Sequence, residues 1–182
     1  KATVIMAGIA IVSTQDEAAK KFSQSIRSEG TEKFSWGLEK LSNGGSSLAL
    51  LGGTYVTSLI IKDPKLKVTS LTAIEGLAVA AVLTTVGKNL FHRTRPNSTD
   101  NAFEFSGPKL GGGNVSFPSG HTGSIFAVAT VFAEAYKDTK LVPIIAYSVA
   151  TLSGLSRVHD NKHWVSDVLG GAVLGYLAGK YV

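Results

Sequence analysis

The 182-residue sequence contains no cysteine, only five prolines and few charged residues, which make up 17% of the chain. The absence of cysteine excludes disulfide bonds, zinc–thiolate sites and thiol chemistry. It does not indicate whether the protein resides in an oxidising or a reducing compartment. Low charge together with 44% hydrophobic residues excludes an intrinsically disordered chain. We therefore expect one domain over residues 1–182. The net charge of +5 favours anionic partners without distinguishing nucleic acid, anionic lipid and phosphorylated substrate.

Apolar runs of about 20 residues, the length of a membrane-spanning helix, are also scarce. Six shorter apolar blocks occur instead, over residues 2–12, 46–61, 71–86, 121–135, 141–155 and 167–179. Their length and their Ala and Leu content predict an all-α fold, a six-helix bundle. The blocks are many, evenly spaced and joined by short charged connections, so we expect a membrane-embedded bundle, with the uncharged residues 41–61 as the best spanning segment. A soluble bundle with unusually apolar helices is the alternative.

The segment 13–45, between the first two blocks, has a different pattern. Asp16 and Glu17 predict the start of one short helix, and Thr31 with Glu32 predicts the start of a second. Apolar residues repeat at helical spacing in both. We expect a short amphipathic helical segment that lies flat at a membrane interface or covers one end of a soluble core.

Residues of catalytic types begin where the third block ends. Lys88 and Arg95 are seven residues apart, which is two helical turns, so both cations can approach one point before Pro96 prevents the helix from continuing. A basic helix end that complements the helix dipole has the same pattern. We expect the neighbouring His92 and Arg93 to be local surface or supporting groups.

The residues Pro118, Ser119, Gly120 and His121 directly precede the fourth block. Ser119 is well placed to be the N-cap of this helix, and Gly120 allows close approach to the amides of its first turn. His121 then lies beside any anion that binds there. An ordinary capped helix with a polar histidine is the alternative interpretation.

A third group lies between the fifth and sixth blocks. Arg157 is followed by His163 and Asp167, which are four residues apart. If the last helix starts near Lys162, both share one face, and Asp167 can accept a hydrogen bond from one imidazole nitrogen while the other keeps its lone pair. This arrangement is typical of an oriented nucleophile, although a histidine and aspartate pair on a helix surface is also common.

Together the three segments read KxxxxxxRP, PSGH and SRxxxxxHxxxD, in this order. The sequence resembles the type 2 phosphatidic acid phosphatase superfamily, which also contains bacterial acid phosphatases and vanadium haloperoxidases. The resemblance spans residues 88–167, and every defining position is present: Lys88, Arg95, Pro96, Pro118, Ser119, Gly120, His121, Ser156, Arg157, His163 and Asp167. The six blocks resemble the layout of the membrane-bound members. The first block departs from it with only 11 residues, and because the chain opens with Lys1, we expect a leading segment to be missing or removed.

The resemblance implies a role for each motif residue. His163 would attack phosphorus and form a phosphohistidine, Asp167 would orient its ring, and His121 would protonate the leaving oxygen. The remaining positions would bind the non-bridging phosphate oxygens: Lys88, Arg95, Ser119, Gly120 and Arg157. No metal and no other cofactor is implied.

The implied activity is metal-independent hydrolysis of a lipid phosphate or diphosphate, such as phosphatidate, phosphatidylglycerol phosphate, polyprenyl diphosphate or a lipid A phosphate. A soluble broad-range periplasmic acid phosphatase is the alternative, and a vanadium-dependent haloperoxidase is disfavoured by the short chain. No nucleic-acid module is present, and the sequence does not predict an oligomeric state.

Charge also predicts how the chain is oriented. Lysines gather at the helix ends opposite the motifs: Lys1, Lys62, Lys65, Lys67, Lys137, Lys140 and Lys180. Short lysine-bearing connections favour the cytoplasm, so the active site would face the periplasm or the outside of an inner membrane. Among the other polar residues, we expect His159 and Asp160 to be local surface or supporting groups. We expect Glu75 to be a buried acid that pairs with a histidine or a cation, or a helix-end group in a soluble protein.

Overall fold

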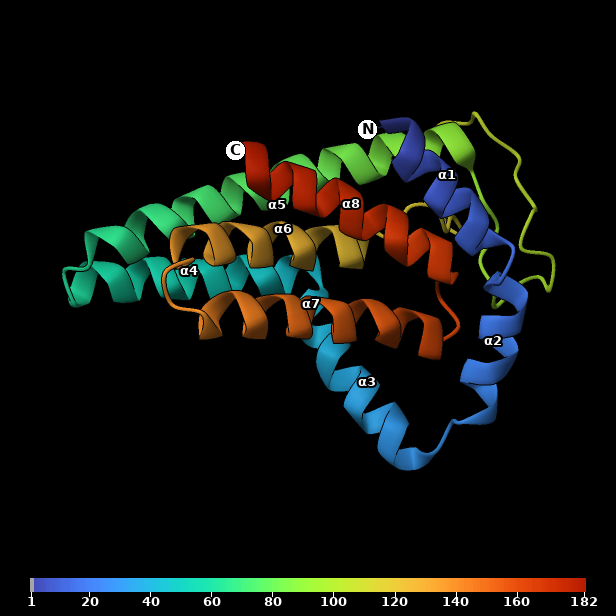
Figure 1. Ribbon diagram of the computed structural model, residues 1–182, viewed down its shortest axis with the longest axis horizontal. Coiled ribbons are helices and arrows are strands. Elements are labelled where there is room, and N and C mark those ends of the chain that lie inside the picture. Colours follow the sequence, from blue (N-terminus) through green and yellow to red (C-terminus); the bar gives the residue numbers. More distant parts are fainter. Residues whose placement is uncertain (1) are drawn as a thin grey trace.

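The computed structural model describes residues 2–182, and over this range it contains eight helices and no strand (Figure 1). The predicted all-α fold is confirmed. The helices are α1 (Ala2–Ser13), α2 (Asp16–Ser25), α3 (Glu29–Ser42), α4 (Gly44–Ile60), α5 (Pro64–Phe91), α6 (Gly120–Ala135), α7 (Leu141–His159) and α8 (Val165–Tyr181). Lys1, one of the lysines that predict the orientation of the chain in a membrane, lies outside the described residues.

Six of these helices correspond to the six apolar blocks, and α2 and α3 form the connecting segment. Helix α6 packs against α5, α7 and α8, which makes it the centre of the bundle. Helices α2 and α3 project from one end of the bundle as a V, with α3 returning to pack against α7 (Figure 1).

The starts of α2 and α3 test the predicted helix boundaries. Helix α2 begins at Asp16, as predicted, whereas α3 begins at Glu29, two residues before Thr31. Ser28 is the N-cap of α3, because its Oγ accepts a hydrogen bond from the Thr31 N–H at 3.2 Å. In return, Thr31 Oγ1 accepts from the Ser28 N–H at 2.9 Å. Thr31 therefore completes a capping box inside the first turn and does not start the helix.

Glycines allow α8 to pack directly on α6. Gly171, Gly175 and Gly179 are spaced four apart and so lie on one face of α8. A Cβ atom on Gly175 would lie 2.2 Å from the carbonyl oxygen of Gly123 in α6, a distance that no side chain can adopt. A Cβ atom on Gly171 would likewise lie 2.4 Å from the carbonyl oxygen of Ser119, so these close contacts hold the N-terminal half of α8 beside the start of α6, where two of the predicted motifs lie.

Two helices, α5 and α7, are long and apolar enough to cross a membrane. Only 33% and 28% of their most apolar stretches are buried in the protein, so most of this apolar surface faces outward, as on a helix that faces lipid. The predicted span 41–61 is wrong, since the chain is interrupted at Asn43, whose side chain caps the 17-residue α4. Glu75 is also not the predicted buried acid, because it is exposed on α5.

Candidate active site

The three motifs meet at one end of the bundle, where α5 and α7 end and α6 and α8 begin (Figure 1). A cleft of about 250 Å³ opens there between the junction of α3 with α4 and the helices α5 and α6. Its walls include Asn43, Gly44, Lys88, Gly120 and His121. The lysines of the α4–α5 and α6–α7 connections lie at the opposite end of the bundle.

The first motif reaches the site by a different path from the predicted one. Helix α5 ends at Phe91, and His92 forms its C-cap in the left-handed region, with φ of 46°. Arg95 therefore lies beyond the helix and not two turns along it from Lys88. It is held by the loop that follows, since its Nε donates to the Val115 carbonyl oxygen at 3.2 Å. Lys88 and Arg95 nevertheless lie within electrostatic range of each other.

The second motif starts α6 as predicted. Ser119 is the N-cap, and its Oγ accepts hydrogen bonds from the Thr122 N–H at 3.4 Å and from Thr122 Oγ1 at 2.9 Å. Both bonds use the serine oxygen as acceptor, so its proton is free to be donated to a ligand. A Cβ on Gly120 would lie 3.8 Å from Lys88 Nζ, which places the lysine beside the first turn of α6. The amides of this turn favour an anion.

His121, the second residue of α6, is the point at which all three motifs converge. Four groups from the other motif segments act on it electrostatically: Lys88, Arg95, Arg157 and His163. The structure therefore brings the predicted site residues together. Three cations and a helix N-terminus at one place repel one another unless an anion lies between them, so the arrangement is suited to a phosphate group.

The third motif holds His163 and Asp167 together less directly than predicted. Helix α8 begins at Val165, after His163 and not near Lys162. His163 Nδ1 lies 3.7 Å from Asp167 Oδ2, an ion-pair distance that is long for a hydrogen bond. Ser116 Oγ lies 3.4 Å from the same nitrogen and donates to Asp167 Oδ2. The carboxylate and the serine thus share the Nδ1 side of the ring, and Nε2 on the other side keeps its lone pair.

His163 is only 2% exposed. Burial lowers its pKa below the ordinary 6.5, and Asp167 only partly opposes this shift by stabilising the protonated ring. The neutral imidazole, which is the nucleophilic form, is therefore the form present at neutral pH.

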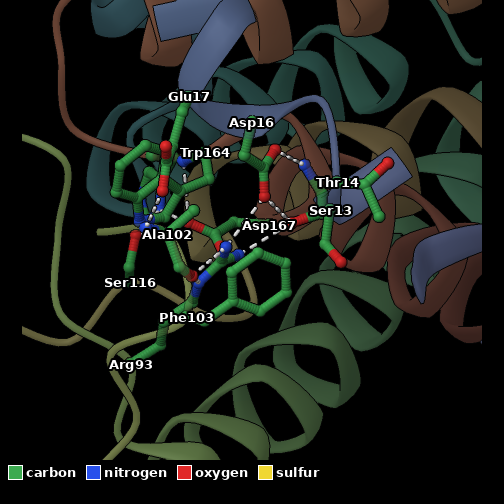
Figure 2. Close-up of polar contacts among 12 residues, drawn as sticks. Ser13, Thr14, Asp16, Glu17, Arg93, Ala102, Phe103, Ser116, Trp164 and Asp167 are labelled. Atoms are coloured by element: carbon green, nitrogen blue, oxygen red, sulfur yellow. Dashed lines mark hydrogen bonds and ion pairs between the residues drawn. The ribbon is translucent and has the colours of Figure 1, made fainter. Parts of the chain in front are cut away.

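Asp167 is fully buried and has a partner for each oxygen (Figure 2). Oδ2 accepts from the Trp164 N–H at 2.8 Å as well as from Ser116, and Oδ1 accepts from Arg93 NH1 at 2.6 Å. Arg93, which was expected to be a local surface or supporting group, is 1% exposed and contacts this carboxylate directly. It therefore supports the site.

Arg157 is also buried, at 2% exposure, and two carboxylates flank it. Its NH2 donates to Asp160 Oδ2, and its NH1 lies 3.5 Å from Glu39 Oε1. Ser35 of α3 donates to the other Asp160 oxygen at 2.6 Å. Asp160 is thus a direct partner of the arginine, and α3 supplies two contacts to this pair, from Ser35 and Glu39. Ser35 lies 125 residues from Asp160, and no local pattern marks it.

Comparison with known proteins decides the family. Residues 69–182, more than half of the chain, match the family model described as the PAP2 superfamily. The chain belongs to the PAP2 superfamily. This confirms the resemblance drawn from the three motifs, and it places α1–α4 outside the matched region.

Two curated relatives and two solved structures are similar to this PAP2 chain. It is 38% identical over 106 residues to lipid A 1-phosphatase of Porphyromonas gingivalis, covering 58% of this chain and 21% of the relative. It is 36% identical over 104 residues to phosphatidylglycerophosphatase B of Bacillus subtilis, covering 53% of this chain and 47% of the relative. The chain thus spans about a fifth and about half of the lengths of these curated relatives.

The structural likenesses extend over nearly the whole fold. A transmembrane PAP2 type phosphatidylglycerolphosphate phosphatase from Bacillus subtilis aligns with a TM-score of 0.76 and 25% identity, covering 98% of this chain and 92% of that one. LpxE of Aquifex aeolicus aligns with a TM-score of 0.67 and 24% identity, covering 88% and 90% of the two chains. The second likeness is one of fold alone. Because the first neighbour is a transmembrane protein, these likenesses and the two apolar helices favour a membrane location.

Proposed function

We propose that this chain is a membrane-bound, metal-independent phosphatase that hydrolyses a lipid phosphate or diphosphate through a phosphohistidine at His163. The observation that carries the proposal is that Lys88, Arg95 and Arg157 all lie near enough to His121, at the start of α6, to act on it electrostatically. Lys88 and Arg95 also act on His163. This cluster has cations for the non-bridging oxygens, a neutral histidine for attack on phosphorus and a second histidine for proton transfer.

In the proposed first step, Nε2 of His163 attacks phosphorus, and the bond from phosphorus to the leaving oxygen breaks. His121 donates a proton to that oxygen. Asp167 and Ser116 face the Nδ1 proton and stabilise the positive charge that develops on the His163 ring. Lys88, Arg95 and Arg157, with the Ser119 hydroxyl and the Gly120 amide, bind the three non-bridging oxygens.

In the second step, water attacks phosphorus and the phosphorus–nitrogen bond breaks. His121, neutral after the first step, accepts the proton of the water. The products are inorganic phosphate and the lipid alcohol, or the lipid monophosphate where the substrate is a diphosphate, and both histidines return to their starting states. The chemistry requires no metal, so chelators are expected to leave the rate unchanged.

The names of the two curated relatives support a lipid as the substrate, with lipid A 1-phosphate and phosphatidylglycerol phosphate as the first candidates. Phosphatidate and polyprenyl diphosphate complete the set. The lysines of the α4–α5 and α6–α7 connections support an orientation in which the opposite, catalytic end faces the periplasm or the outside.

The test is phosphate release by the detergent-purified chain from these four lipids and from p-nitrophenyl phosphate, with His163→Ala as control. We expect one lipid to be preferred, no release by the variant, and inhibition by vanadate, whose five-coordinate form resembles the transition state. Equal activity on the soluble ester would indicate a broad-range acid phosphatase. Strong loss of activity with a chelator would contradict the metal-free mechanism, and no release from any compound would contradict the phosphatase itself.

A further inference from the structure

A second charged cluster lies behind the motif residues, around the buried guanidinium of Arg93. NH1 of Arg93 donates to Asp167 Oδ1 at 2.6 Å, and NH2 donates to Asp16 Oδ2 at 2.8 Å. Figure 2 shows both carboxylates turned toward this one guanidinium. The carbonyl oxygen of Ala102 accepts two further bonds, from Nε at 2.9 Å and NH2 at 2.6 Å. All three ionic side chains are at most 1% exposed.

Asp16 joins this cluster from the other end of the sequence. It is the first residue of α2, it lies outside the matched family region, and no motif includes it. Its Oδ1 accepts from the Ser166 N–H at 2.9 Å, and its Oδ2 accepts from the Ser166 hydroxyl. Asp16 therefore also holds the first turn of α8, in which Ser166 directly precedes Asp167.

The charges of the cluster explain what Asp16 contributes. Arg93 carries one positive charge, and with Asp167 as its only anionic partner it would neutralise the carboxylate that faces His163. Asp16 supplies a second negative charge, so the three groups together retain a net charge of −1. In a buried site this charge is poorly screened by solvent. Lys88 and Arg95, which also act on His163, are positive, and so is His121 when it is protonated. The negative charge of Asp167 is therefore the one that stabilises the imidazolium developing on His163.

We propose that Asp16 is a positioning residue of the catalytic centre, which acts through Arg93 to keep Asp167 oriented and negatively charged toward His163. The amphipathic segment thereby contributes to the reaction although none of its residues belongs to a motif. The catalytic part of this inference rests on the proposed function.

The test is Asp16→Asn, which keeps the shape of the side chain and removes its charge. Glu17→Gln is the matched control, because Glu17 is the next residue of α2 and its Oε1 accepts from the Ala102 N–H at 3.1 Å (Figure 2). We expect Asp16→Asn to lower kcat by about 10- to 100-fold with little change in KM, the range seen when residues that orient metal-binding side chains are replaced. The Glu17→Gln protein should remain within about twofold of wild type.

A double-variant cycle separates positioning from a general structural role. If Asp16 acts through Asp167, adding Asp16→Asn to Asp167→Asn should lower kcat by less than about twofold further, because the two residues act as a unit. A purely structural defect would give the same loss in both backgrounds. That result, or a kcat of Asp16→Asn equal to that of Glu17→Gln, would overturn the proposal.

A second readout does not depend on turnover. The chain has only four histidines, so the ring of His163 can be followed by NMR with labelled histidine and assigned with His163→Ala. Loss of the negative charge at Asp16 should lower the pKa of His163, while Glu17→Gln should leave it unchanged. An unchanged pKa in Asp16→Asn would count against the proposal. If Asp16→Asn lowers the pKa of His163 but the wild-type chain releases no phosphate, the proposed function alone would be refuted.

If Asp16→Asn does not fold, Ser166→Ala takes its place. This variant removes the hydroxyl that bonds both Asp16 and Arg93 and keeps every charge. We expect a severalfold fall in kcat and a smaller shift of the His163 titration in the same direction. A Ser166→Ala protein that matches wild type in both readouts would overturn the proposal.

Discussion

Residues 88–167 supply all the side chains proposed to face the phosphate, whereas the first 60 residues supply side chains that hold those groups from behind. Arg157 and His163 illustrate the first kind, since the first is proposed to bind a phosphate oxygen and the second to attack phosphorus. Asp16 and Glu39 illustrate the second kind, since each contacts a buried arginine from the amphipathic helices. The comparison teaches that the motif region contains the chemistry, while part of its electrostatic balance comes from α2 and α3.

The largest effect is expected on the motif side, from Asp167→Asn. The variant removes the charge opposite His163 Nδ1 and leaves Trp164 N–H and Ser116 able to bond the remaining carbonyl oxygen. We expect kcat to fall by about 10³- to 10⁴-fold, as for the aspartate of a serine protease triad. The measurement is kcat with the preferred lipid, alongside thermal unfolding. A smaller loss of kcat than in Asp16→Asn would show that the supporting residue of α2 matters more to the reaction than the motif aspartate.

Two substitutions at one guanidinium compare the two regions. Arg157→Lys changes the motif side chain itself, and Glu39→Gln changes a supporting side chain of α3 that contacts it. Lysine cannot reproduce the planar fork of the arginine, so we expect kcat to fall by about 100-fold or more. Glu39 is 40% exposed and 3.5 Å from the guanidinium, so Glu39→Gln should change kcat by less than about threefold. Equal losses would show that α3 takes part in the chemistry itself.

The scaffold that both regions share is tested by Gly175→Ala. The added Cβ would overlap the Gly123 carbonyl oxygen, so α8 must move away from α6, at a cost of about 1–3 kcal/mol in stability. Gly53→Ala on α4 is the control, because no heavy atom lies within 4 Å of its added Cβ. Thermal unfolding in detergent should show a lower midpoint for Gly175→Ala only. A lower midpoint for both variants would show that replacing any helical glycine destabilises the protein, whether or not it packs against another backbone.

The smallest effect is the contribution of His163 to the pH dependence of stability. Because its pKa is lower in the folded protein than the ordinary 6.5, the unfolded chain takes up a proton first as pH falls. Stability from this group is fully present above about pH 6.5 and is lost between 6.5 and the folded pKa, by at most about 1.4 kcal/mol per pH unit. Wild type should therefore lose more stability than His163→Ala over this window. A steeper loss in the variant would mean that the folded protein raises the pKa.

Much of the fold was predictable because it depends on local patterns. The apolar blocks mark α1 and α4–α8, and Ser119 was correctly predicted as the N-cap of α6. The errors concern chain paths between helices. Arg95 lies past the end of α5 because His92 turns the chain, and His163 precedes α8 because Trp164 is its N-cap. The positions of these helix ends depend on single capping residues, which the spacing of motif residues in the sequence does not reveal.

The supporting groups were not predictable for a different reason. Asp16 is 77 residues from Arg93 and 150 from Ser166, and Ser35 is 125 residues from Asp160. The sequence pattern predicts Asp16 only as a helix-start residue, which it is, and tertiary packing gives its carboxylate a second contact, with Arg93. Contacts over such separations follow from how α2 and α3 fold back on the bundle, and one sequence contains no periodic pattern that encodes them.

The central claim is that His163 is the nucleophile, and trapping the phosphoenzyme tests it most directly. The purified chain is mixed with lipid substrate labelled in its phosphate, stopped in base, where phosphohistidine is stable, and the labelled peptide is identified by mass spectrometry. The account predicts phosphate on His163, absent in His163→Ala. Phosphate on another residue, or turnover by His163→Ala at the wild-type rate, would contradict it.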